Sequence, residues 1–147
     1  MPIKTFRGSI ADEAQDTITL HTNTGMTGYR IVKFELFPSS PGDAVQESVV
    51  KVFTIKQTDT SISSTVDFSD QTLLAAGYLA LNSAAYYGND YITIFDHVIV
   101  NQDLTITHKN PTTGINAAVN YYIELEQVKL DLNENTVATL KDIRNQA

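Results

Sequence analysis

The chain has 147 residues, of which 42% are hydrophobic and 18% are charged, a composition typical of one globular domain over residues 1–147 and not of a disordered chain. Its formal net charge is −7, and its ten Lys and Arg residues are scattered along the chain. Because this field would repel a phosphate backbone, direct nucleic-acid binding is disfavoured. The chain has no cysteine, which excludes a disulfide framework and a thiolate site.

No segment of the sequence approaches the roughly 18 consecutive apolar residues of a membrane span. The N-terminus, Met1–Glu13, turns polar too early for a secretory signal peptide. We therefore expect a protein that is made and assembled in the cytoplasm and that makes no contact with a membrane.

Period-two alternation of apolar and polar residues, rich in β-branched and aromatic side chains, dominates the chain from Ile3 to Asp131. In chain order, strands are predicted at Ile3–Arg7, Asp16–Thr22, Tyr29–Phe37, Val49–Gln57, Ser63–Phe68, Tyr91–Val100, Leu104–His108 and Val119–Asp131. Residues that favour turns separate these segments. About eight short strands without βαβ alternation favour a mainly β fold, an antiparallel β-sandwich of the jelly-roll type.

Two of the predicted strands carry finer patterns. Alternate side chains of Tyr29–Phe37 should face the core, namely Val32, Phe34 and Leu36. In Val119–Asp131 the inward-facing parity changes around Glu126–Gln127. This change predicts a β-bulge there, or a strand that passes between two environments.

Two segments have helical features. Ser69–Leu81 is compatible with a short helix capped by its first residue, although Gly77 weakens it. A C-terminal helix over 131–146 is better supported, because Asp131 and Glu134 have the spacing of a capping box. Val137, Leu140, Ile143 and Ala147 share its apolar stripe, and the first three are the candidate contact residues. This stripe must dock either on the protein's own sheet or on a neighbouring subunit.

Motifs for metal binding are weak. Asp131, Asn133 and Asn135 have the spacing of the first ligands of a calcium loop, but Thr136 and Asp142 stand where its Gly and bidentate Glu belong. The histidines lie in separate strand segments, at His21, His97 and His108. Ordinary strand positions explain them more simply than a shared metal site. We therefore predict no metal and no cofactor.

Motifs for catalysis are equally weak. Glu124 and Glu126 share one strand face with Tyr122, and their spacing of about 6.6–7 Å would suit an inverting glycosidase. A solvated sheet face is the simpler interpretation of these residues. The sequence has no nucleophile elbow and no Gly-rich phosphate loop. We predict that the protein is not an enzyme and has no catalytic residue.

Two pairs of adjacent tyrosines are more suggestive, Tyr86–Tyr87 and Tyr121–Tyr122. A tyrosine combines a large apolar body with a polar tip and is favoured at interfaces and sugar-stacking surfaces. In each pair one ring should face the core and the other is a candidate contact. The candidate interface residues are therefore Tyr86, Tyr87, Tyr122, Val137, Leu140 and Ile143.

Three segments carry a resemblance, namely FSDQTLLAAGY at Phe68–Tyr78, NQDLTITH at Asn101–His108, and the final stretch Tyr121–Ala147. They resemble segments of small virion proteins of tailed phages that infect marine bacteria, and the similarity spans nearly the whole chain. The resemblance implies a structural protein of the phage particle, a jelly-roll module that acts in homo-oligomers. It carries over no active-site residue.

Within a virion, two functions from different classes remain open. The first is a capsid decoration or cement protein that binds the major capsid protein and copies of itself, for example as a trimer. The second is a tail-fibre or receptor-binding module that recognises host-surface glycan through Tyr86, Tyr87, Asn89 and Asp90. Decoration is favoured because no fibre-attachment coiled coil is visible. A metal-dependent cupin-like enzyme would share the fold, but the clustered His and Glu ligands are missing.

Overall fold

The computed structural model describes residues 2–22, 25–39, 46–57, 62–81, 90–111 and 117–130. These ranges contain strands and loops and no helix. The strands in chain order are β1 (Ile3–Ile10), β2 (Ala14–Ile18), β3 (Thr27–Pro38), β4 (Gln46–Phe53), β5 (Leu73–Leu81), β6 (Asp90–Phe95), β7 (Leu104–Lys109) and β8 (Val119–Lys129). The predicted C-terminal helix over 131–146 lies outside the described residues.

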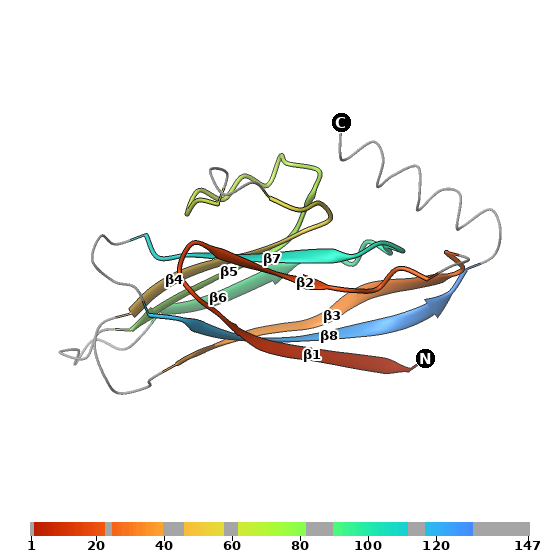
Figure 1. Cartoon of the computed structure of the whole chain (residues 1–147), viewed down its shortest axis with the longest axis horizontal. Coiled ribbons are helices and arrows are strands. Elements are labelled where there is room, and N and C mark those ends of the chain that lie inside the picture. Colours follow the sequence, from red (N-terminus) through yellow and green to blue (C-terminus); the bar gives the residue numbers. More distant parts are fainter. Residues whose placement is uncertain are drawn as a thin grey trace.

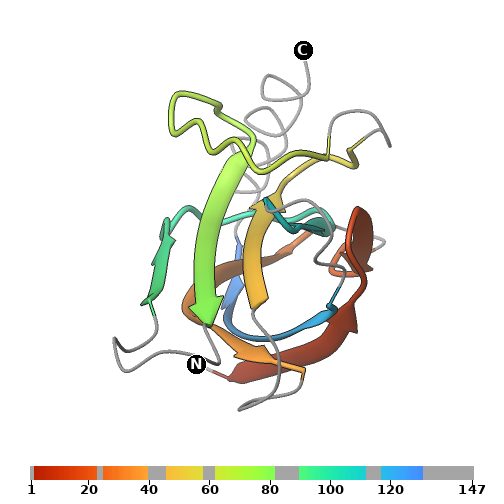
Figure 2. The ribbon, with the colours of Figure 1, turned by 90° about the vertical axis from the view of Figure 1, so that its left-hand side faces the viewer.

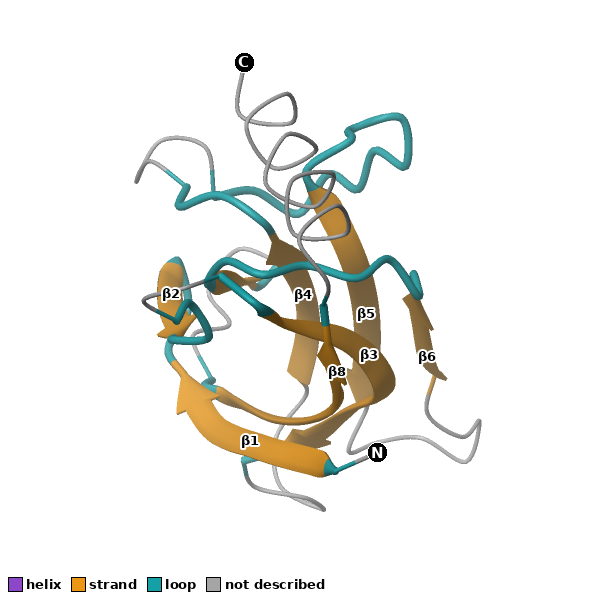
Figure 3. Ribbon diagram, turned by 90° about the vertical axis from the view of Figure 1, so that its right-hand side faces the viewer, coloured by secondary structure: helices purple, strands orange, loops and turns teal. Residues whose placement is uncertain are grey.

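The strands form two antiparallel sheets, which are stacked as two layers (Figure 1). The three-stranded sheet has the order β1-β8-β3, and the five-stranded sheet has the order β2-β7-β4-β5-β6. Figure 3 shows the same layers from one end of the molecule, where β6 lies at the margin next to β5. The predicted mainly β, antiparallel architecture is confirmed.

The core lies between the two sheets, because in each strand alternate side chains face the opposite layer. Its most deeply buried apolar side chains are Ile31, Phe34, Ile123 and Leu125 from one sheet and Val50, Val52, Leu104 and Ile106 from the other. Burial of each such side chain contributes about 1.5–3 kcal/mol relative to leaving it exposed. The layers approach closely at Gly77, where a Cβ would lie 2.8 Å from Cδ1 of Leu36. A larger residue there would force the Leu36 side chain to shift.

Two predictions between residues 63 and 81 are wrong. Ser63–Phe68 is not a strand but belongs to the loop 62–72, which lies over the outer side of the five-stranded sheet (Figure 1). Ser69–Leu81 is not a helix, because its larger part, Leu73–Leu81, is strand β5 and pairs with both β4 and β6. Hydrogen bonding to two neighbouring strands outweighs the helix propensity of its Leu and Ala residues.

The β-bulge lies on β3 and not on β8. The register between these strands shifts between Ile31 and Lys33, which makes Val32 the extra residue. β8 pairs with β1 up to Glu126 and with β3 from Glu126 to Lys129 without a shift, so the bulge predicted around Glu126–Gln127 is wrong. Because the bulge reverses the parity of β3, Ile31 is buried in the core and Val32 is only half-buried.

The predicted strand Tyr91–Val100 is shorter in the structure. β6 ends at Phe95, and the chain then leaves the five-stranded sheet. At Val100 it forms an isolated antiparallel bridge with Tyr29 of β3, with N···O distances of 2.7 and 2.9 Å. The segment from β6 to Val100 thus passes from one sheet to the other.

Candidate functional site

Of the candidate interface residues, Tyr122 is the one that falls within the described ranges. Tyr86, Tyr87 and the helix stripe Val137, Leu140 and Ile143 lie outside them. Tyr121 is buried, and its hydroxyl donates a 2.6 Å hydrogen bond to Oδ2 of Asp16 on β2. The neighbouring ring of Tyr122 is half-buried on the opposite face. The expectation that one ring of this tyrosine pair faces the core is confirmed.

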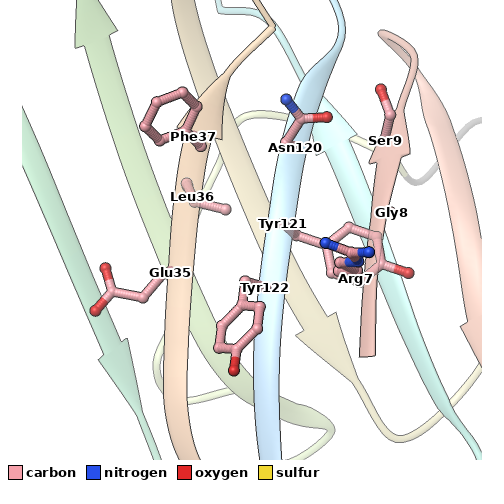
Figure 4. Close-up of a pocket in the computed structure, with 9 residues that line it drawn as sticks. All are labelled: Arg7, Gly8, Ser9, Glu35, Leu36, Phe37, Asn120, Tyr121 and Tyr122. Atoms are coloured by element: carbon pink, nitrogen blue, oxygen red, sulfur yellow. The ribbon is translucent and has the colours of Figure 1, made fainter. Parts of the chain in front are cut away.

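Tyr122 lies in a groove on the outer face of the three-stranded sheet, called here the Tyr122 groove (Figure 4). Its volume is about 650 Å³, and it is lined by Arg7, Gly8, Ser9, Glu35, Leu36, Phe37, Asn120, Tyr121 and Tyr122. Arg7 of β1 and Glu35 of β3 are the direct neighbours of Tyr122 across the sheet. An aromatic ring between a cation and a carboxylate, with exposed Phe37 nearby, forms a mixed aromatic and polar surface.

The tyrosine ring of this groove is held by charged neighbours. Its hydroxyl donates to Oε1 of Glu124 at 2.9 Å, and Nζ of Lys33 lies 5.8 Å from the centre of the ring. The hydrogen bond to Glu124 raises the pKa of Tyr122 above its ordinary value. The ring therefore remains a neutral hydrogen-bond donor near neutral pH.

The two carboxylates that the sequence placed on one strand face have separate partners. Glu124 accepts the hydrogen bond from Tyr122. Glu126 forms a bidentate ion pair with Arg30 of β3, with N···O distances of 3.0–3.2 Å. Fork-like pairing of this kind fixes both side chains in one geometry.

A second surface lies on the outer face of the five-stranded sheet. Its exposed apolar side chains are Val66, Phe68, Ile92 and Ile94, which we call the β6 patch. They line a hollow of about 370 Å³ together with Ala76 and Tyr78 of β5. Figure 2 shows β6 at the margin of its sheet and the loop 62–72 joining β5 where that strand starts. Such gathered apolar residues on a protein surface mark sites of interaction.

Part of this outer face, at β4, is covered by the chain itself. The ammonium group of Lys51 donates a 2.8 Å hydrogen bond to the backbone oxygen of Thr65. The backbone N–H of Thr54 donates to the oxygen of Thr72 at 2.9 Å. Burial lowers the pKa of Lys51, although the charge of Asp70 opposes this effect. These contacts hold the loop 62–72 over the sheet.

The three histidines are far from forming a common site. His21 binds Oδ1 of Asp103 through Nδ1 at 2.7 Å. His97 is exposed and packs edge-on against Phe95, with ring centres 5.4 Å apart. His108 is buried in the core. Within the described residues, no group of three or more His, Asp or Glu residues is placed to hold a metal ion.

His108 has an unusual environment. Its Nδ1 lies 2.9 Å from the backbone oxygen of Ile10, and its Nε2 has no hydrogen-bond partner among the described residues. Burial lowers the pKa of His108, although hydrogen bonds to the backbone and the charge of Asp12 oppose this effect. The imidazole is therefore neutral at neutral pH and donates through Nδ1.

Sequence reasoning missed the β6 patch and the groove partner Arg7. The segment Tyr91–Phe95 was predicted as a strand, but it is apolar on both faces, so alternation alone does not tell which face is exposed. Phe68 was assigned to a strand that does not exist, and its exposure depends on how the loop lies over the sheet. Aspartates at both ends of YITIF, Asp90 and Asp96, were the available signal that this strand lies at a sheet margin.

No protein-family model matches the chain, and none of the curated proteins compared with it matches it either. In the part of the chain that the structure describes, no helix is long and apolar enough to cross a membrane.

Proposed function

We propose that this protein is a structural component of a tailed-phage particle, a capsid decoration or cement protein that binds the major capsid protein and copies of itself. The observation that carries this proposal is the β6 patch, where Val66, Phe68, Ile92 and Ile94 are all exposed beside one hollow. Contact with another protein would remove these side chains from water, at about 25 cal/mol per Å² of apolar surface. The resemblance of the sequence to phage virion proteins supports the same assignment.

A jelly-roll topology, with the helix over 131–146 attached to it, belongs to this proposal. In a jelly roll of eight strands, the two sheets have the orders β1-β8-β3-β6 and β2-β7-β4-β5. The strand order here differs only in that β6 pairs with β5. Two contacts nevertheless bring the segment from Tyr91 to Val100, which includes β6, alongside β3. They are the bridge of Val100 to Tyr29 and the 3.0 Å hydrogen bond from the N–H of Leu36 to the hydroxyl of Tyr91.

The first experiment counts copies of this protein in purified particles by quantitative mass spectrometry against the major capsid protein. A decoration protein should occur in a fixed ratio to the capsid subunit. Ile92→Asp, which places a charge in the β6 patch, should reduce this ratio at least tenfold. The matched control is Thr17→Asp, on the exposed face of β2 at the opposite margin of the same sheet, and it should leave the ratio unchanged. Absence of the wild-type protein from particles would contradict the proposal.

A second candidate function is recognition of host-surface glycan, favoured by the Tyr122 groove. Tyrosine and phenylalanine rings present apolar faces to a sugar, and Arg7, Glu35 and Asn120 offer donors and acceptors for its hydroxyls. This function predicts few copies per particle and binding of the isolated protein to a glycan array. Tyr122→Ala should abolish that binding, while Tyr78→Phe, on β5 of the other sheet, should retain it. A fixed ratio to the capsid subunit together with no glycan binding would exclude this candidate.

A further inference from the structure

The β6 patch is a groove with two apolar walls. One wall consists of Val66 and Phe68 from the loop 62–72, and the other of Ile92 and Ile94 from β6. The floor includes Ala76, a small residue that leaves depth between the walls. The groove is thus shaped for a row of aliphatic side chains carried by a separate segment.

Both walls are fixed in place. The loop wall is held by the hydrogen bond from Nζ of Lys51 to Thr65, and its turn is closed by hydrogen bonds from Thr72 to Oδ1 of Asp70 at 2.7 and 2.9 Å. The strand wall pairs with β5 over the length of β6. A groove with fixed walls does not have to be ordered when a partner arrives, which lowers the cost of binding.

The rim of the groove is acidic. Glu47 lines it, Asp67 lies between the two loop residues of the wall, and exposed Asp96 directly follows β6. Hydrogen bonds from the side chain and backbone of Ser69 lower the pKa of Asp67, so this carboxyl is charged at neutral pH. Two cations lie nearby, and both have partners. Lys51 is buried beneath the loop with its ammonium group turned to Thr65, and Lys109, opposite Val49 in the sheet, forms an ion pair with Glu13. An occupant should therefore combine an apolar row with flanking positive charge.

We propose that the occupant is the C-terminal segment 131–147 of a second copy of this chain. Its predicted apolar stripe, Val137, Leu140 and Ile143, is accompanied by the cations Lys141 and Arg144. In the predicted helix the acidic residue Asp142 falls on the side opposite to the stripe. Apolar stripe and basic flank match the apolar walls and acidic rim of the groove. This inference names the contact for the self-association in the proposed function and rests on it.

A second copy fits better than the chain's own C-terminus. β8 belongs to the three-stranded layer, and Leu130 at its end donates a hydrogen bond to Met26 of that same layer (Figure 1). The groove lies on the outer face of the other layer. The capping pair Asp131 and Glu134 predicts that a helix starts directly after Leu130. On this prediction no linker residues lie between β8 and the helix, which favours the groove of a second copy over the groove of the same chain.

The test uses disulfide cross-linking, because the chain has no cysteine of its own. Ile94→Cys and Leu140→Cys are made as separate full-length variants, mixed and oxidised. The mixture should give a reducible covalent dimer containing one copy of each variant. The matched control replaces Ile94→Cys with Thr17→Cys, an exposed position on the far margin of the same sheet, and should give at least tenfold less dimer. A double variant, Ile94→Cys with Leu140→Cys, reports contact within one chain.

Three results would overturn the inference: no dimer from the mixture, equal dimer from the control, or a cross-link confined to single chains of the double variant. A second measurement uses light scattering with circular dichroism. Leu140→Asp should convert the oligomer to a folded monomer, whereas Leu140→Ile should keep it assembled. Unfolding of Leu140→Asp would place the stripe in the protomer's own core and contradict the inference. Counting copies in the virion is independent of these results, so the two proposals fail separately.

Discussion

The outer faces of the two sheets differ in the side chains that they expose to solvent. The three-stranded sheet meets solvent with charged and aromatic side chains, among them Arg30 paired with Glu126 and Tyr122 beneath Lys33. The five-stranded sheet is covered by the loop 62–72 and leaves the β6 patch exposed. Charge on the first face is stabilised by water and by neighbours in the sheet. The apolar groove on the second face gains most from another protein, which makes it the better candidate for assembly.

The largest expected effect comes from the core that both sheets share. Phe34→Ala removes a ring that is 1% exposed, and it should lower the free energy of unfolding by about 3–5 kcal/mol. Phe37→Ala, on the same strand but on the outer face, should change it by less than about 0.5 kcal/mol. Urea denaturation measures both. Similar losses for the two variants would contradict the assignment of inner and outer faces on β3.

Two lysine substitutions, one on each outer face, should lower the free energy of unfolding by smaller and different amounts. Lys51→Ala removes the hydrogen bond that holds the loop and should cost about 1.5–3 kcal/mol. Amide hydrogen exchange should accelerate in the loop 62–72 and stay unchanged in β1 and β8. Lys33→Ala on the solvated face removes a ring contact worth about 0.5–1 kcal/mol. Equal exchange rates in the loop for wild type and Lys51→Ala would show that other contacts hold the loop over the sheet.

The pH dependence of stability should come from the core beneath both faces. Since burial lowers the pKa of His108 below its ordinary value of 6.5, the unfolded chain binds more protons than the folded one. The free energy of unfolding should keep its maximum contribution from His108 above pH 6.5, and it should decrease as the pH drops below this value. His108→Asn, whose amide nitrogen can replace Nδ1 as the donor to Ile10, should flatten the decline that begins below pH 6.5. An unchanged slope would mean that another group titrates there.

The smallest effect is expected for the ion pair on the solvated face. Arg30→Ala should lower the free energy of unfolding by no more than about 1 kcal/mol, because the guanidinium group is partly exposed. The difference should shrink further in 1 M salt, where the screening length is about 3 Å. A larger loss, insensitive to salt, would show that this face depends on the pair for its folding.

The period of the sequence predicts most of this fold. Segments such as Tyr29–Phe37 and Val119–Asp131 alternate clearly and were found as β3 and β8. The failures occur where pairing in three dimensions decides. Leu73–Leu81 is rich in helix-forming residues and becomes a strand between two others. Val32 does not face the core because it is the extra residue of a bulge on β3. The position of a bulge depends on the register with the neighbouring strand, which the sequence of one strand does not show.

The candidate site was predictable only in part. Tyr122 stood out because two adjacent tyrosines on a strand must face opposite ways. The β6 patch could not be predicted, because its side chains come from a loop and a strand that are distant in sequence and meet only in the folded chain. Ile92 and Ile94 alternate with Tyr91 and Phe95, so both faces of that strand looked equally apolar.

The most direct test compares two rings of nearly equal exposure on the two faces, Phe68 at 64% and Phe37 at 61%. Hydroxyl-radical footprinting with mass spectrometry would measure their oxidation in the monomeric Leu140→Asp variant and in purified wild-type particles. We expect strong protection of Phe68 in the particle, with Phe37 oxidised as fast as in the monomer. Protection of Phe37 with Phe68 unchanged would contradict the account and place the contact on the Tyr122 groove.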